Sequence, residues 1–265
     1  MTAELHIDGE PASAADLAHQ ALVNYGAFTS FRVEDGAVRG LDRHLARLEA
    51  SAVELFGEAV GEARLRDLTR RALDGRGEAW LRVSLFAPEI SNREPHWIGR
   101  PRVMVGVFDP PAPLAGGLRV QSQAFEREAP HLKSVATLGL LRARRAARLA
   151  GFDDALFRDR DGRISEGTLW NVGLIAGDAV VWPQAAMLDG VAQQLIRCGL
   201  AEAGVGQRER AVRLSDLSGF DGAFLCNSAT PAAAIAAIDS HVFPGATAMI
   251  ERVAAAWRSQ PRQAI

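Results

Sequence analysis

The chain is poor in three reactive side chains, with one lysine, one tyrosine and two cysteines among 265 residues. Because 29 of its 30 Lys and Arg residues are arginine, Lys133 is the only side-chain amine. Arginine can serve ion pairs and phosphate contacts, but its guanidinium cannot act as an amine nucleophile. A lysine in a dry or electropositive pocket can lose its proton and form an imine. An arginine-rich coding bias would also leave one lysine by chance, so the surroundings of Lys133 decide between the two interpretations.

The two cysteines exclude a disulfide framework. Cys198 and Cys226 each lie in an apolar stretch, which indicates two separate buried thiols. The six histidines show no HxxxH-type spacing, so we expect no metal site.

An excess of charge of one sign and long apolar runs are also absent. The net charge is −2 and the pI about 6.3, which excludes a basic footprint for nucleic acid or an anionic membrane. No apolar run reaches membrane-spanning length, and the opening MTAELHIDGE is too acidic and interrupted for a signal peptide. We therefore expect a cytoplasmic protein that binds neither nucleic acid nor membrane.

Hydrophobic periodicity predicts a fold of the α/β (α+β) class in two lobes. The most Pro/Gly-dense stretch, residues 109–117, is the best candidate linker, so we place the lobes at 1–112 and 113–265. Helical spacing predicts helices within 43–57, 62–77, 137–152 and 189–204, with a last one after Pro244. Strand patterns with turn residues occupy 22–39, 79–88, 100–110, 117–125, 153–183 and 220–231.

Lys133 and Glu166 together indicate cofactor chemistry. Lys133 follows a Pro-His-Leu loop and precedes a predicted helix, and Glu166 follows a DG turn in RISEGTLWN. An imine-forming lysine needs an electron sink, which pyridoxal phosphate supplies. A carboxylate such as Glu166 against the pyridine nitrogen would keep that nitrogen protonated.

A phosphate group would need backbone N–H groups at a helix start and an arginine. Gly190 precedes a predicted helix whose first N–H groups belong to Val191 and Ala192, and Arg47 lies in RHLARL. The segment CNSATP predicts a small polar loop at a strand end.

Four motifs in order resemble the class IV pyridoxal-phosphate aminotransferases of fold type IV, which include branched-chain and D-amino-acid aminotransferases and 4-amino-4-deoxychorismate lyase. They are GAFTSFRVEDG with HLARL, the HLK lysine, DGRISEGTLWN, and LDGV followed by NSATP, over roughly residues 24–235. The resemblance implies a small N-terminal α+β lobe, a larger C-terminal lobe, pyridoxal phosphate at their interface, and a homodimer.

The resemblance also assigns roles to individual residues. Lys133 would form the imine with the cofactor and shuttle a proton, while Glu166 would pair with the pyridine nitrogen. The other implied cofactor contacts are Arg47, backbone N–H groups of Val191 and Ala192, the side chain of Ser228 or Asn227, and Asn171 in a supporting position.

The chain departs from the family pattern at several positions. Ala192 and Gln193 stand where the family usually has Thr and Arg, and Leu138 replaces a tyrosine typical of branched-chain enzymes. Ser30 stands where the lyase has a threonine thought to assist proton transfer.

These departures leave three functions open. The first is an aminotransferase acting on an amino acid or amine and a 2-oxo acid. The second is 4-amino-4-deoxychorismate lyase, giving 4-aminobenzoate and pyruvate, and the third is a non-catalytic relative that has lost its cofactor. Ser30 and Arg32 are candidate substrate contacts, and Arg82, Arg102 and Arg127 are further candidates for a substrate carboxylate.

Overall fold

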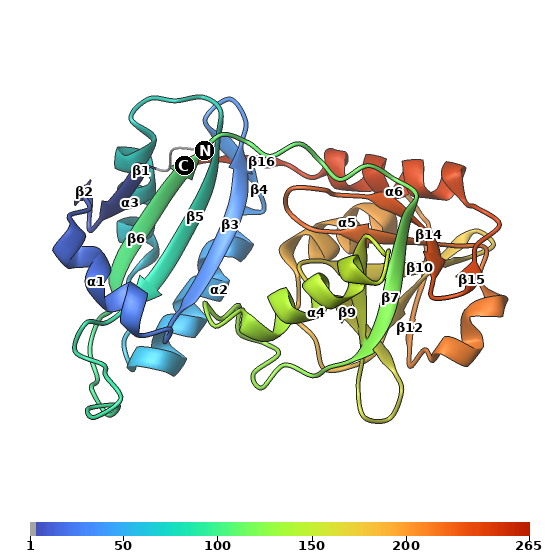
Figure 1. Ribbon diagram of the computed structural model, residues 1–265. Helices are drawn as coiled ribbons and strands as arrows, with labels where there is room; N and C mark the ends of the chain where they lie inside the picture. Colours follow the sequence, from blue (N-terminus) through green and yellow to red (C-terminus); the bar gives the residue numbers. More distant parts are fainter. Residues whose placement is uncertain (1–3) are drawn as a thin grey trace. The chain divides into compact units, whose positions relative to one another are not determined.

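The computed structural model describes residues 4–265 and divides the chain into two compact units (Figure 1). Unit 1 holds the residues up to Pro111 together with Leu132–Ala136 and Pro261–Ile265, and unit 2 holds Ala112–His131 and Thr137–Gln260. The chain thus first passes from unit 1 to unit 2 after Pro111, one residue before the predicted boundary. Two stretches assigned from sequence to the C-terminal lobe belong to unit 1, and one of them carries Lys133. Residues 1–3 lie outside the described residues. They belong to MTAELHIDGE, the segment considered above as a signal peptide.

Unit 1 is built on a five-stranded antiparallel sheet in the order β2-β1-β6-β5-β3. These strands are β1 (Glu4–Ile7), β2 (Glu10–Pro11), β3 (Ala27–Val33), β5 (Ala79–Phe86) and β6 (Arg102–Phe108). Its helices are α1 (Ala14–Leu22), α2 (Leu41–Phe56) and α3 (Glu62–Leu73), and β4 (Ala37–Arg39) pairs with β16 (Arg262–Ala264).

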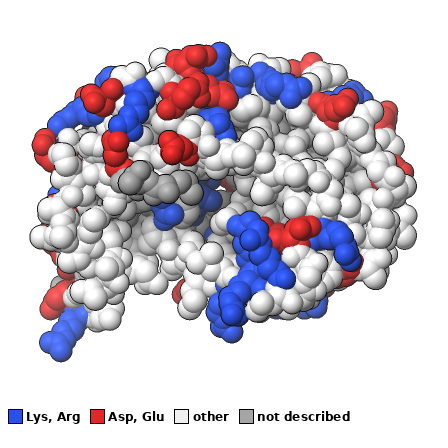
Figure 2. All heavy atoms as spheres, turned by 45° about the horizontal axis from the view of Figure 1, so that its top comes forward, with Lys and Arg blue, Asp and Glu red and all other residues white. Residues whose placement is uncertain are grey.

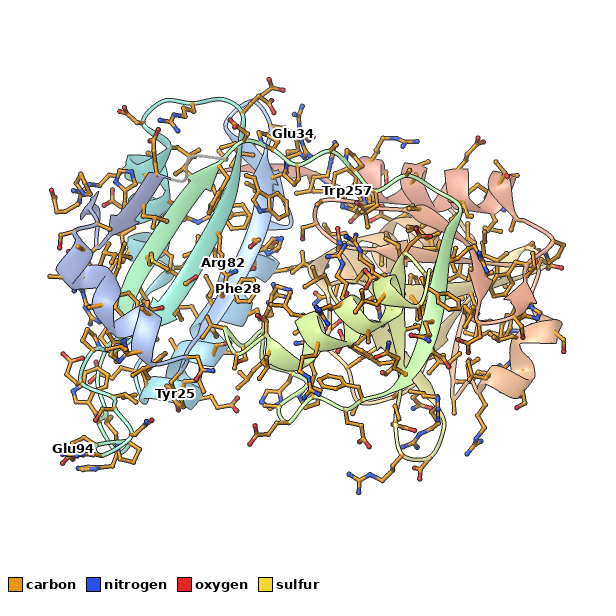
Figure 3. All side chains as sticks on the ribbon, viewed as in Figure 1. Tyr25, Phe28, Glu34, Arg82, Glu94 and Trp257 are labelled. Carbon is orange, nitrogen blue, oxygen red and sulfur yellow. The ribbon has the colours of Figure 1, made fainter. Side chains whose placement is uncertain are left out.

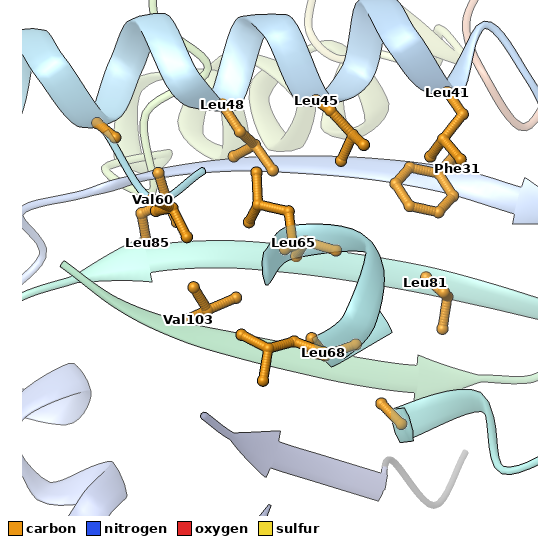
Figure 4. Close-up of a cluster of buried hydrophobic side chains, with 14 of the residues drawn as sticks. Phe31, Leu41, Leu45, Leu48, Val60, Leu65, Leu68, Leu81, Leu85 and Val103 are labelled. Carbon is orange, nitrogen blue, oxygen red and sulfur yellow. The ribbon is translucent and has the colours of Figure 1, made fainter. Parts of the chain in front are cut away.

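The core of unit 1 forms where α2 and α3 meet one face of this sheet (Figure 4). Leu41, Leu45 and Leu48 recur at helical spacing along α2, and each is 1% exposed. Alternate strand residues such as Phe31 and Leu81 meet them. The neighbours of Phe31 and Leu81 along their strands therefore point to the other face of the sheet. These neighbours include Ser30 and Arg82.

Unit 2 contains a nine-stranded sheet, most of which closes into a ring. Because β9 pairs with both β8 and β10, the strands β10-β13-β14-β7-β8-β9 form a closed circuit. The strands are β7 (Leu118–Ala124), β8 (Asp154–Arg158), β9 (Ile164–Gly167), β10 (Asn171–Ala176), β11 (Ala179–Pro183), β12 (Gly206–Arg210), β13 (Gly222–Cys226), β14 (Ala233–Ile238) and β15 (His241–Val242).

The helices of unit 2 include the connections between parallel strands. Parallel β7 and β8 are joined through α4 (Leu138–Leu149), and parallel β11 and β12 through α5 (Val191–Glu202). Helix α6 (Thr247–Ser259) packs beside α5, and a 3-10 helix spans Leu214–Gly219. Since α5 joins β11 to β12, its first residues lie shortly after the end of β11.

Every helix and strand predicted from periodicity is present, whereas β1, β2, α1, β12, β14, β15, β16 and the 3-10 helix were not predicted. Both cysteines are free, with Cys226 buried as predicted and Cys198 only half-buried. Lys and Arg are interspersed with Asp and Glu over the face shown in Figure 2. Among residues 4–265, no helix combines the length and apolar character needed to cross a membrane.

Candidate active site

Lys133 lies in a short segment that pairs with the start of β3 in unit 1. Phe28 N–H donates to the Lys133 carbonyl at 2.9 Å, and Val135 N–H donates to the Gly26 carbonyl at 3.0 Å. The Lys133 Nζ lies 5.0 Å from the centroid of the Phe28 ring. The Arg82 guanidinium carbon lies 3.7 Å from the same centroid, and Figure 3 labels Arg82 and Phe28. Unit 1 therefore gathers two cationic side chains on one aromatic ring.

Arg47 is held by a buried hydrogen-bond network on the same unit. Its Nη2 donates to Thr29 Oγ1 at 2.7 Å, and this oxygen lies 2.6 Å from His44 Nδ1. Burial lowers the pKa of His44 well below its ordinary value of 6.5, and the charges of Arg47 and Lys133 lower it further. A neutral His44 can accept the Thr29 hydroxyl hydrogen at Nδ1, while Thr29 accepts from Arg47. The network thus fixes the direction of the Arg47 side chain.

The arginines proposed for a substrate carboxylate differ in their partners. Arg102 pairs with Asp8 at 2.8 Å and with Asp16 at 3.1 Å. Arg127 pairs with Glu166, and Arg32 donates to the Pro111 carbonyl. Arg82 makes no ion pair with a carboxylate of residues 4–265, and its hydrogen bond to Ser84 Oγ is long, at 3.4 Å.

Ser30 and Arg82 are directly opposite each other on β3 and β5. Both are half-buried, on the sheet face opposite α2 and α3. Burial lowers the pKa of the Arg82 guanidinium from its usual value, although a guanidinium stays charged in proteins. A partly desolvated cation without a carboxylate partner is suited to bind an anion.

Glu166 is the best-anchored carboxylate of the candidate site in unit 2. Arg127 Nε donates to its Oε1 at 2.7 Å, and Arg127 Nη2 lies 3.5 Å from Oε2. The Leu188 N–H also donates to Oε1, at 3.3 Å. The side chains of Glu166 and Arg127 are 4% and 12% exposed, so the pair is largely desolvated. Its forked geometry restricts the carboxylate to one orientation.

Asn171 joins Glu166 to the start of α5. The two residues face each other across the β9–β10 pair. Asn171 Nδ2 donates to the Leu188 carbonyl at 2.8 Å, so Glu166 and Asn171 hold the N–H and the C=O of one residue. A Cβ on Gly190 would lie 2.0 Å from Asn171 Oδ1, so only glycine permits this approach. Asn171 therefore positions the start of the helix.

The start of α5 has the properties of an anion site. Gly190 provides no side-chain cap, and the first helical residues, Val191 and Ala192, are 2% and 3% exposed. Their N–H groups belong to the helix turn that has no intrahelical acceptor, and the helix dipole adds partial positive charge. These donors fit a phosphate group. The chain keeps this backbone site although Ala192 and Gln193 replace Thr and Arg.

Asn227 and Ser228, the two candidate side chains in the turn 227–230, differ in their hydrogen bonding. Asn227 Oδ1 accepts from the N–H groups of Ala229 and Thr230 at 2.9 and 2.7 Å, and its Nδ2 donates to the Leu169 carbonyl at 3.2 Å. The Asn227 amide therefore shapes the turn. Ser228 is half-buried, and among residues 4–265 no hydrogen bond occupies its hydroxyl. Ser228 is the better candidate for a contact with a bound group.

Three contributors to the site have roles that the motifs did not assign to them, although His44 begins HLARL and Leu188 begins LDGV. Arg127 was one of several possible carboxylate ligands, yet it pairs with Glu166, 39 residues away. Leu188 acts through its backbone alone, and His44 acts through Thr29. Within residues 4–265, no three His, Cys, Asp or Glu side chains gather as a metal site would require.

Comparison with known proteins gives consistent matches. The family model described as amino-transferase class IV matches residues 26–238. A Methanocaldococcus jannaschii protein provisionally assigned as a branched-chain-amino-acid aminotransferase is 25% identical over 259 residues, covering 89% of this chain and 86% of the relative.

Two solved structures illustrate the similarity of fold. An aminotransferase from Brucella abortus, bound to the cofactor PLP, superposes with a TM-score of 0.82 at 22% identity, covering 97% of this chain and 98% of the other. A Legionella pneumophila protein provisionally assigned as 4-amino-4-deoxychorismate lyase has a TM-score of 0.76 at 20% identity, covering 87% and 89%. The similarity confirms the predicted mixed α/β fold of fold type IV, whereas the predicted arrangement of two lobes stays a prediction. At these identities the similarity shows the fold alone.

Proposed function

The chain belongs to the amino-transferase class IV family, and from that premise we propose that it is a pyridoxal-phosphate-dependent aminotransferase. It would move an amino group between an amino acid or amine and a 2-oxo acid. The observation that carries the proposal is the family match over residues 26–238, which includes Lys133, the only lysine of the chain. The same match includes Glu166 and the turn 227–230.

Unit 1 would supply the reactive amine. Bound pyridoxal phosphate supplies a ring that accepts negative charge from the substrate's α-carbon. The Lys133 Nζ would hold this group and, once released, would move the proton at that carbon. Arg47, aligned by Thr29 and His44, would bind the phosphate.

Unit 2 would supply the contact to the ring nitrogen and further contacts to the phosphate. The Glu166 carboxylate, oriented by Arg127 and the Leu188 N–H, would accept a hydrogen bond from the protonated ring nitrogen. The N–H groups at the start of α5 and the Ser228 hydroxyl would bind the phosphate. The charge of Arg47 and the backbone N–H groups can compensate in part for the Thr and Arg side chains that Ala192 and Gln193 replace.

Borohydride reduction with peptide mapping tests the cofactor assignment directly. Added pyridoxal phosphate should give a visible absorbance band, and reduction should leave the adduct on Lys133. Since the chain has one lysine, the N-terminal amine is the only other expected target, and an adduct there alone would reject the assignment. Lys133→Arg keeps the charge but should abolish turnover, because a guanidinium cannot form the imine. A wild-type protein that stays colourless would favour a non-catalytic family member.

The lyase is the second candidate, because Ser30 keeps a hydroxyl where that enzyme has its threonine and lies opposite Arg82. The assay compares two reactions of the purified protein. Amino transfer that depends on an added 2-oxo acid supports the aminotransferase. Pyruvate release from 4-amino-4-deoxychorismate without any acceptor supports the lyase.

Arg82 is the strongest candidate for a substrate carboxylate contact, in preference to Arg32. It shares the Phe28 ring with Lys133 and has no carboxylate partner in residues 4–265. We expect Arg82→Gln to lower kcat/KM for a carboxylate-bearing donor by roughly 10- to 100-fold, the value of a charge-assisted hydrogen bond. A simple amine donor is the matched control and should lose little. Equal losses for both donors would reject the carboxylate role.

The homodimer and the cytoplasmic location remain predictions. Light scattering during size-exclusion chromatography measures the mass of the assembly. A species of twice the chain mass of 28.4 kDa would support the dimer, and a monomer at micromolar concentration would contradict it.

A further inference from the structure

Asp154 is a buried carboxylate that the proposed chemistry does not use. It is the first residue of β8 and is 3% exposed. Its Oδ1 accepts from Thr168 Oγ1 at 2.7 Å, and its Oδ2 accepts from Trp170 Nε1 at 3.1 Å. Arg144 Nε lies 3.5 Å from Oδ2. A buried charge is tolerated only when it is well partnered, so the positions of these donors are tightly coupled to Asp154.

The Ala155 N–H also donates to Asp154 Oδ1, at 2.8 Å, whereas the two side-chain donors Thr168 and Trp170 belong to the turn 168–170 that joins β9 to β10. The turn is closed by Gly167 N–H, which donates to the Trp170 carbonyl at 2.8 Å. The Trp170 indole lies against Gly167, where a Cβ would come 2.0 Å from the ring. Thr168 and Trp170 are 1% and 2% exposed. Asp154 therefore fastens both ends of a densely packed turn.

This turn lies directly between two residues of the candidate site. Glu166 precedes Gly167, Asn171 follows Trp170, and the two are partners across the strand pair. Directly opposite residues share one sheet face, and a slip of one residue would move a side chain to the other face. The turn also contacts the 227–230 turn, because the Leu169 carbonyl accepts from Asn227 Nδ2.

We propose that Asp154 is a positioning residue for the cofactor site. By accepting hydrogen bonds from Thr168 and Trp170, it fixes the turn 168–170 and with it the register of Glu166 and Asn171. The inference rests on the proposed function, since that function assigns the two positioned residues to the cofactor. A merely structural aspartate would affect thermal stability without affecting the geometry of this turn.

Asp154→Asn tests the proposal against a matched control, Asp159→Asn. Asp159 is also buried, at 5% exposure, and its carboxylate accepts from Arg163 Nε at 2.6 Å. It lies at the other end of the β8–β9 hairpin, away from residues 166–171. We expect both variants to lower the melting temperature. Only Asp154→Asn should weaken pyridoxal phosphate binding, measured by absorbance titration, on the order of tenfold, and shift its visible band.

Hydrogen exchange of the cofactor-free protein supplies a readout independent of the proposed function. Asp154→Asn should speed exchange in peptides covering residues 164–172, whereas Asp159→Asn should not. If Asp154→Asn does not fold, Trp170→Phe and Thr168→Val each remove one donor and keep most of the packing, and the same local effect is expected.

The outcomes separate the two hypotheses. Wild-type exchange in 164–172 together with an unchanged dissociation constant would overturn the positioning role. A wild-type protein that binds no pyridoxal phosphate would reject the proposed function, and the exchange result would still decide whether Asp154 fixes the turn.

Discussion

Replacing Arg127 by methionine isolates the contribution of the ion pair to Glu166. The side chain keeps most of its apolar length but loses both contacts to the carboxylate, at 2.7 and 3.5 Å. Breaking a buried ion pair from one side costs about 3–5 kcal/mol, because the remaining buried charge loses that partner. The Leu188 N–H still donates to Glu166, so we place the loss at the lower end, about 3 kcal/mol.

Urea unfolding followed by circular dichroism measures this loss in the cofactor-free protein. With a slope of about 3 kcal/mol per molar urea, the midpoint of the transition should fall by about 1 M. The double variant Arg127→Met with Glu166→Gln removes the Glu166 charge as well. We expect it to be clearly more stable than Arg127→Met alone, so that the two losses are not additive.

Two results would refute this reasoning. The first is an Arg127→Met protein within about 0.5 kcal/mol of the wild type, the range of ordinary surface substitutions. The second is a double variant whose loss equals the sum of the single losses, which would mean that the two side chains do not interact energetically.

The remaining predictions concern glycine and histidine. Gly190→Ala should destabilise the protein by about 1–3 kcal/mol, the cost of overpacking, because its Cβ would lie 2.0 Å from Asn171 Oδ1. Thermal unfolding measures this loss, and a wild-type melting temperature would contradict the close approach of Gly190 to Asn171. For His44 the folded-state pKa is lowered from the ordinary value of 6.5, so below that pH the unfolded chain binds a proton that the folded chain does not. Below about pH 6.5, the free energy of unfolding should therefore decrease as the pH is lowered, by up to about 1.4 kcal/mol per pH unit. This pH dependence should be weaker in His44→Gln. If the urea midpoint changes equally with pH in both proteins between about pH 5.0 and 6.5, the contribution of His44 is excluded.

Local patterns predicted the elements that bury one regular face. Helix α2 has apolar residues at helical spacing, and β5 alternates between buried and half-buried residues over its first half. The elements that were not predicted lack such a face. Helix α1 buries no residue, β16 exists through pairing with β4 more than 200 residues away, and the sequence of β14, AAIAAI, carries no strand signature.

Motif order likewise identified the residues whose chemistry is distinctive, but not their partners. Lys133 was singled out as the only lysine, yet its membership of unit 1 depends on pairing with β3 from 105 positions along the chain, seen in the Phe28 to Lys133 backbone hydrogen bond. The four candidate arginines have the same side chain, so only their contacts in the structure distinguish Arg82.

The anchoring of Glu166 shows why such partners escape sequence analysis. The groups that orient or position the carboxylate include a guanidinium 39 residues before it, a backbone N–H 22 residues after it and, as proposed above, Asp154 acting through the turn. None has a fixed spacing imposed by helix or strand geometry, because each depends on how the closed circuit of strands brings distant segments together. A backbone N–H is also available at any residue except proline, so Leu188 could be a leucine for reasons of packing alone. The orientation of the carboxylate is therefore a property of the unit 2 fold, and substitutions at Arg127 or Asp154 should change it while every motif residue is unchanged.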